Sequence, residues 1–162
     1  MKKILTILFI LILNNIYSQE TFAYQSKRHL FNKYLIDKNI TNKIKKKQFE
    51  KGFQYEVTYL GSFKTTKGLK FYIINSSYVN LKSLHNDNEI FIYNNKKEFV
   101  GYYNLATNYQ LPILLKNNKL FFKLEDCGNK ILKINFNSGI QNIIELKCDN
   151  DNVDVIEFIT KS

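Results

Sequence analysis

The chain has 162 residues, which suits one domain of ordinary size and is too short for two. Hydrophobic residues make up 44% and charged residues 23%, values that are normal for a globular protein and exclude wholesale disorder. The net charge is +10, yet Arg28 is the only arginine. Because guanidinium groups carry most of the bidentate recognition of phosphates and base edges, this composition argues against a nucleic-acid partner.

The first segment, residues 1–18, has the pattern of a secretory signal peptide. Two lysines give it a positive start, a run of ten mostly apolar residues follows over Ile4–Leu13, and the small residue Ser18 stands before Gln19. Ten apolar residues span about 15 Å as a helix, roughly half of a bilayer core, so the pattern predicts export rather than a membrane anchor. No later segment is long and apolar enough to span a bilayer. We therefore expect a periplasmic or extracellular protein without a transmembrane anchor.

The two cysteines, Cys127 and Cys148, have two interpretations. In an oxidising compartment they would form a disulfide, whose closure of the intervening loop is worth about 3 kcal/mol. Their separation in space does not follow from the sequence, so two unpaired, half-buried thiols are the alternative.

Residues 19–52 form a basic segment with nine basic and three acidic residues, and they predict one or two helices. Phe31, Tyr34 and Leu35 fall on one stripe at helical spacing. A second short helix, over residues 41–51, has few apolar side chains and is expected on the surface.

Residues 53–162 follow a β pattern, and we expect residues 19–162 to fold as one unit. Tyr55, Val57 and Tyr59 alternate with polar neighbours, as in a half-buried strand. Eight to ten short strands separated by local turns predict a mostly-β fold, an antiparallel meander that forms a sandwich or a partly closed barrel. The expected strands are Gln54–Leu60, Leu69–Asn75, Glu89–Tyr93, Phe99–Leu105, Ile113–Lys116, Lys119–Leu124, Lys130–Phe136, Ile140–Cys148 and Val153–Ile159.

Residues that carry catalytic chemistry are few. His85 and Asp87 form a His-x-Asp pair in a polar loop, which would give a small hydrolase a base and an orienting carboxylate, although a turn is the simpler explanation. His29, beside other basic residues, is interpreted as a solvated side chain. Zinc motifs and glycine-rich phosphate loops are absent from the sequence, and residues 149–154 lack the glycine and glutamate that an EF-hand needs. We expect neither a metal nor a cofactor.

A run of lysines is the first candidate for a binding surface. These side chains would attract an anionic polymer or membrane surface, or would form an ordinary solvated helix face. The lysines are Lys43, Lys45, Lys46, Lys47 and Lys51.

Three tyrosines of the central strands, Tyr93, Tyr102 and Tyr103, are the second candidate. Successive side chains of a strand point to opposite faces, so Tyr102 or Tyr103 should be exposed or lie under a loop. Exposed tyrosines on a sheet would bind a protein or a glycan, whereas cross-strand aromatic pairs would only stabilise the sheet.

The N-terminal pattern, with Met1-Lys2-Lys3 before an Ile/Leu core and Ser18-Gln19-Glu20 after it, resembles signal peptides of flavobacteria and their relatives. The rest is similar to short, β-rich secreted proteins of those bacteria, in the hairpin of Glu89–Tyr93 with Phe99–Tyr103 and in the strand end at Cys148. This resemblance implies export and carries over no catalytic residue. We expect an exported module that binds an unknown protein or polymer of the cell envelope, and we leave its oligomeric state open.

Overall fold

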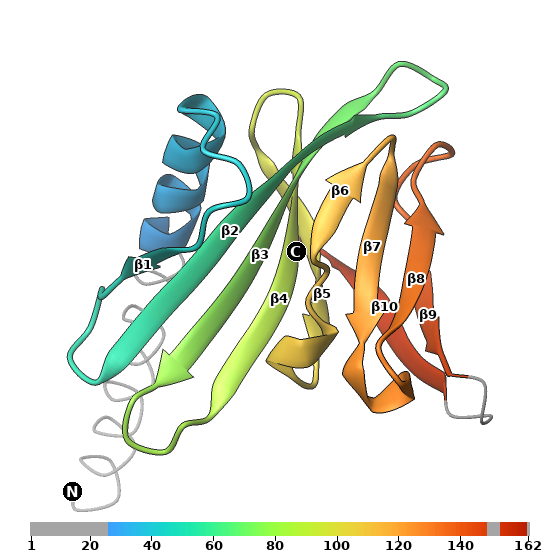
Figure 1. Ribbon diagram of the computed structural model, residues 1–162. Coiled ribbons are helices and arrows are strands. Elements are labelled where there is room, and N and C mark those ends of the chain that lie inside the picture. The colour runs from blue at the N-terminus through green and yellow to red at the C-terminus, as the bar shows by residue number, and fades with distance from the viewer. Residues whose placement is uncertain (1–25, 149–152, 162) are drawn as a thin grey trace, which may run out of the picture.

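A computed structural model describes residues 26–148 and 153–161 (Figure 1). The expected signal peptide and the acidic turn at residues 149–152 lie outside the described residues. Within them, residues 26–37 are helical and the strands form two sheets in which all paired strands are antiparallel.

The larger sheet has seven strands in the order β1-β2-β3-β4-β5-β10-β9, and the smaller has the order β6-β7-β8. The larger sheet contains β1 (Lys45–Lys47), β2 (Phe53–Lys64), β3 (Lys70–Asn80), β4 (Asn86–Asn94), β5 (Phe99–Leu105), β9 (Ile143–Lys147) and β10 (Val153–Thr160). The smaller sheet contains β6 (Leu114–Lys116), β7 (Lys119–Leu124) and β8 (Lys130–Asn135), and two short 3-10 helices are η1 (Asn108–Gln110) and η2 (Glu125–Cys127).

The larger sheet is covered on both faces, which makes the fold sandwich-like rather than a closed barrel (Figure 1). The helix buries Leu35 and Ile36 against one face, together with Tyr55, Val57, Tyr59, Ile74, Phe91 and Tyr93. The smaller sheet buries Leu120 and Phe122 against the other face, together with Ile73, Ile90, Ile92 and Tyr103. Fully burying one such side chain is worth about 1.5–3 kcal/mol, so these two clusters hold the three layers together.

A bulge in β2 decides which of its side chains face which layer. The pairing of β2 with β3 shifts between Tyr59 and Gly61, so Tyr59 packs beneath the helix and Phe63 packs beneath the smaller sheet. Gly61 has a φ of +130°, a conformation that favours glycine, and a Cβ there would lie 3.7 Å from Leu115 of β6. Since 3.7 Å is an ordinary van der Waals contact, the positive φ rather than the space around it accounts for glycine at this position.

The predicted fold class is confirmed, and the predicted strands Phe99–Leu105 and Lys119–Leu124 coincide with β5 and β7. The first helix is also confirmed. The second helix, over residues 41–51, was wrong because this stretch contains β1, which pairs with β2. A helix there would bury few apolar groups, whereas an extended chain satisfies the free N–H and C=O groups at the edge of β2.

Candidate functional site

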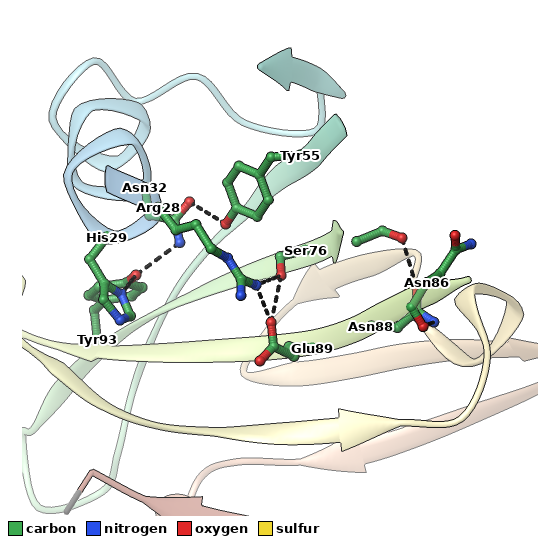
Figure 2. A network of polar contacts seen from close by, with 10 residues as sticks. Arg28, His29, Asn32, Tyr55, Ser76, Asn86, Asn88, Glu89 and Tyr93 are labelled. Atoms are coloured by element: carbon green, nitrogen blue, oxygen red, sulfur yellow. Dashed lines mark hydrogen bonds and ion pairs between the residues drawn. The ribbon is translucent and has the colours of Figure 1, made fainter. Parts of the chain in front are cut away.

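The first polar feature lies between the helix and the larger sheet (Figure 2). The guanidinium of Arg28 donates to Ser76 Oγ at 2.9 Å and forms an ion pair with the Glu89 carboxylate. It also lies over three aromatic rings, with Cζ 5.0 Å from the centroid of Tyr55, 5.9 Å from that of Tyr78 and 4.9 Å from that of Phe91. Arg28 is only 7% exposed, so removing its partner would leave an uncompensated buried charge.

Asn32 connects the two buried tyrosines of this network. Its Nδ2 donates to the Tyr93 hydroxyl at 2.9 Å, and its Oδ1 accepts from the Tyr55 hydroxyl at 2.8 Å (Figure 2). Burial raises the pKa of Tyr93 well above its ordinary value and also raises the pKa of Tyr55. Both hydroxyls therefore stay protonated and partnered, and they fix the helix on the sheet.

His29 is not solvated, contrary to the prediction. Its Nδ1 lies 2.7 Å from the Tyr93 hydroxyl, and its ring centroid is 4.3 Å from that of Phe99. Burial lowers the pKa of His29 to about 4, with smaller contributions from the positive charges of Arg28, Lys161 and Lys33. The imidazole is thus neutral at pH 7.

A small cavity adjoins this network. Its volume is about 80 Å³, far below the 300–1,000 Å³ of typical ligand sites. The cavity is lined by Arg28, His29, Glu89, Phe91, Phe99 and Tyr102. The polar network therefore anchors the helix and leaves no room for a substrate.

The second polar feature is a groove of about 610 Å³ over the opposite face of β2, β3 and β4. Its floor carries Glu56 and Thr58 from β2, Asn75 and Ser77 from β3, and Asn86 from β4. Strand register places these residues side by side, since Thr58 pairs with Asn75 and Glu56 pairs with Ser77. We call this surface the polar groove.

The sides of the polar groove come from two segments outside the three strands. The residues before β1 contribute Asn42 and Ile44, and the residues between η1 and β6 contribute Leu111, Pro112 and Ile113. The polar groove therefore lies beside the start of the smaller sheet, over a part of the larger sheet that the smaller sheet does not cover.

The polar groove carries almost no net charge. Among the described residues that line it, none is basic, and Glu56 is the acidic one. The Glu56 carboxylate lies 2.5 Å from Lys46 Nζ and also accepts from Gln54. The floor thus presents neutral amides and hydroxyls, although the protein as a whole is strongly basic.

Asn75 holds one side of the polar groove in place. Its Nδ2 donates to the carbonyl oxygen of Pro112 at 2.5 Å, which ties the segment before β6 to β3. Its Oδ1 is buried and receives no hydrogen bond. An unsatisfied buried acceptor costs about 1–3 kcal/mol, so this position sacrifices stability. The neighbouring Ser77, in contrast, donates to Asn88 Oδ1 at 2.8 Å.

The predicted catalytic pair, His85 and Asp87, lies on the open surface. His85 Nε2 is 3.6 Å from Asp87 Oδ1, and the two side chains are 79% and 62% exposed. Both side chains are therefore in contact with solvent, and a substrate bound beside them would keep most of its water. This arrangement does not favour catalysis by the pair.

The predicted lysine surface does not lie on a helix. Lys45, Lys46 and Lys47 form the edge strand β1, and strand alternation sends Lys46 to the face opposite its two neighbours. Lys46 pairs with Glu56, and Lys43 is exposed before the strand. Charged side chains on an edge strand discourage pairing with another chain, which is a sufficient reason for them.

The three predicted tyrosines do not share a surface. Tyr93 is buried under the helix, and Tyr103 is buried under the smaller sheet with its hydroxyl donating to the Gln141 carbonyl at 2.6 Å. Tyr102 is partly buried and packs with Phe99, their centroids 6.4 Å apart. These tyrosines therefore mainly stabilise the packing between the sheets and the helix.

The two cysteines form a disulfide, which decides between the two interpretations of the sequence. Cys127 ends η2 and Cys148 follows β9, and their Cα atoms are 5.5 Å apart. The bond thus ties the end of the smaller sheet to the edge of the larger one.

Residues of the polar groove were missed because they sit inside strands. A signal was present in Asn75-Ser76-Ser77, three polar residues in the middle of an otherwise apolar strand. A polar triplet at such a position needs hydrogen-bond partners or a ligand. One face of this strand is covered by the helix, and the other forms part of the polar groove.

Comparisons with protein-family models, with curated proteins and with solved structures gave no match to this chain. Across residues 26–148 and 153–161, no helix is long and apolar enough to cross a membrane. Over the same residues, no three His, Cys, Asp or Glu side chains gather in a way that would hold a metal ion. Fold and site together define a β-sandwich with a helix on one face of the larger sheet and the neutral polar groove on the opposite face.

Proposed function

We propose that this protein is an exported binding module that holds a neutral ligand in the polar groove. The observation that carries this proposal is the set of amide and hydroxyl side chains that line the polar groove, with the buried, unpartnered Oδ1 of Asn75 beneath them. A neutral polar floor in a basic protein suits a ligand that is recognised by hydrogen bonds rather than by charge.

The polar groove favours binding over the two other functions that the sequence suggested. A hydrolase built on His85 and Asp87 would need a sheltered site around the pair, and both side chains are largely exposed. An electrostatic binder would need its lysines on one surface, and β1 divides them between two faces.

Export is supported by the pattern of residues 1–18 and by the disulfide, which suits an oxidising compartment. Expression of the full chain in a Gram-negative host tests it. Mass spectrometry of the recovered protein should show that the first 18 residues are gone and that the protein lies outside the cytoplasm. A full-length protein in the cytoplasm would contradict export.

Binding is tested by NMR titration of the ¹⁵N-labelled protein with three small probes. N-methylacetamide and methyl glucoside are neutral, and acetate is an anion. We expect a neutral probe to shift the backbone amides of Asn75, Ser77 and Asn86, and we expect acetate to leave them unchanged. Shifts confined to Lys43–Lys47 with acetate would favour the electrostatic function, and no shift in the polar groove with either neutral probe would contradict our proposal.

A further inference from the structure

Resting on the proposed function, a further inference concerns the class of ligand. We propose that the polar groove binds an extended, uncharged stretch of peptide through the main-chain amides of the peptide. The charge of the groove, its hydrogen-bonding groups and its apolar side chains each restrict the class of ligand.

Charge restricts the ligand first. Lysine and arginine are missing from the described residues that line the groove, and the carboxylate of Glu56 is held by Lys46. A phosphate, a sulfate or an acidic polysaccharide would lose its water here without gaining a cation. The ligand is therefore neutral over the length that enters the groove.

The hydrogen-bonding groups suit a peptide main chain. A primary amide carries both donors and an acceptor, the same pair of groups that a peptide unit presents. Asn42, Asn75, Asn86 and Asn108 all line the groove. Asn42 and Asn108 are exposed, so their amides can pair with the N–H and the C=O of the ligand at once, whereas the Nδ2 of Asn75 already donates to Pro112.

The floor also contains an acceptor that lacks a donor. Asn75 Oδ1 receives no hydrogen bond, and the Nδ2 of the same amide holds Pro112. Because Oδ1 lies below the surface, a ligand N–H reaches it when the amide turns or when the segment at Pro112 gives way. Binding should therefore perturb Ile113, the residue that follows Pro112.

The apolar side chains of the groove distinguish a peptide from a sugar. Ile44 and Ile113 line the groove and are 67% and 53% exposed, so they offer a ligand apolar contacts beside the polar floor. Aromatic rings, on which sugar rings stack, are missing from the described lining residues. An extended peptide alternates its side chains and can place apolar ones on Ile44 and Ile113 while its amides meet the floor.

The test uses a blocked tetrapeptide, acetyl-Val-Ala-Val-Ala-amide, which spans about 13 Å when extended. Calorimetry and NMR titration compare it with the same peptide N-methylated at both alanines, and with N-methylation at both valines instead. We expect the parent peptide to bind and to shift Asn75, Ser77 and Ile113. We expect one of the two N-methylated peptides to bind at least tenfold more weakly, because alternate N–H groups point toward the floor.

A pair of matched variants locates the binding. Ile113→Ser removes an exposed isoleucine of the groove, whereas Ile131→Ser removes one from β8, outside it. We expect about fivefold weaker binding for I113S and wild-type binding for I131S. Equal effects of the two substitutions would overturn the placement of the peptide in the groove.

Failure of this inference is distinct from failure of the binding function. If cellotetraose shifts the groove amides and the tetrapeptide does not, the peptide class is wrong and the groove remains a binding site. If neither binds, the peptide inference is overturned, and the N-methylacetamide and methyl glucoside titrations decide the broader proposal separately.

Discussion

The two faces of β3 and β4 use polar residues in opposite ways. On the helix side, Ser76 and Glu89 belong to a closed network around Arg28, and each of these side chains has a partner. On the groove side, Asn75 and Ser77 are neutral, they lie beside an open groove, and Asn75 has an acceptor without a donor. Polar residues one position apart in the same strand thus belong to a closed ionic network on one face and to a neutral groove on the other.

The difference follows from charge. A buried ion pair must be complete, because one unpaired charge in a low-dielectric interior costs several kcal/mol. A neutral amide is cheaper to leave unsatisfied, at about 1–3 kcal/mol, so a fold tolerates it where a ligand gains from it. Substitutions on the helix side should therefore destabilise strongly, and those on the groove side should not.

The largest effect is expected for Glu89→Ala. This change leaves the guanidinium of Arg28 without its carboxylate in a buried position, which should lower the free energy of unfolding by about 3 kcal/mol. Urea denaturation measures it. As a control, Asp37→Ala removes the partner of Lys97 in an exposed ion pair and should have no measurable effect. Similar small losses in both variants would contradict a structural role for the network.

The disulfide should come next. Replacing Cys127 and Cys148 by serine opens a link between residues 21 apart and should cost about 3 kcal/mol of unfolding free energy. Thermal unfolding with and without a reducing agent measures it. The reductant should destabilise the wild type and leave the double variant unchanged, and an equal response of both proteins would contradict this assignment.

A smaller effect should depend on pH through His29. Its pKa falls from 6.5 when unfolded to about 4 when folded, so the unfolded chain binds a proton first as the pH drops. The neutral His29 contributes its full stabilisation above pH 6.5, and this contribution is lost as the pH falls from 6.5 to about 4. After allowance for the partial exposure of the ring, the free energy of unfolding should fall by about 2 kcal/mol over this range. Urea denaturation across this range tests it.

Two histidine variants identify the source of that pH dependence. His29→Gln should remove much of the loss between pH 6.5 and 4, whereas His85→Gln, at an exposed position, should leave the curve unchanged. A wild-type slope in H29Q would show that other groups cause it.

The smallest effect on stability should appear at Asn75→Leu. The leucine is close in size, loses the hydrogen bond to Pro112 and also removes the unpaired acceptor. These two contributions oppose each other, so the free energy of unfolding should change by less than about 1 kcal/mol. A loss above 2 kcal/mol in urea denaturation would show that Asn75 is a structural residue like Glu89.

Much of the fold could be predicted from local patterns. Alternation in Tyr55, Val57 and Tyr59 identifies a strand with one buried face, and the helical stripe with Leu35 identifies the element that covers it. The stretch around β1 was mistaken for a helix because it becomes a strand only by pairing with the edge of β2. In that pairing Lys46 lies opposite Glu56, ten residues further along the chain. Propensity contains no information about that distant partner.

The sites were harder to predict than the fold. Arg28 and Glu89 meet across 61 residues, and the polar groove combines segments from Asn42 to Ile113. Such contacts arise from topology and leave little local trace. The exception is the polar triplet at Asn75, whose position inside an apolar strand is visible in the sequence.

The central claim is that the polar side chains of the groove serve binding more than stability. The most direct test measures both properties on Asn75→Leu, with unfolding by urea and binding of acetyl-Val-Ala-Val-Ala-amide by calorimetry, beside the wild type. We predict that N75L keeps wild-type stability to within about 1 kcal/mol and binds the peptide at least tenfold more weakly. A destabilised variant that binds the peptide as well as the wild type does would contradict the claim.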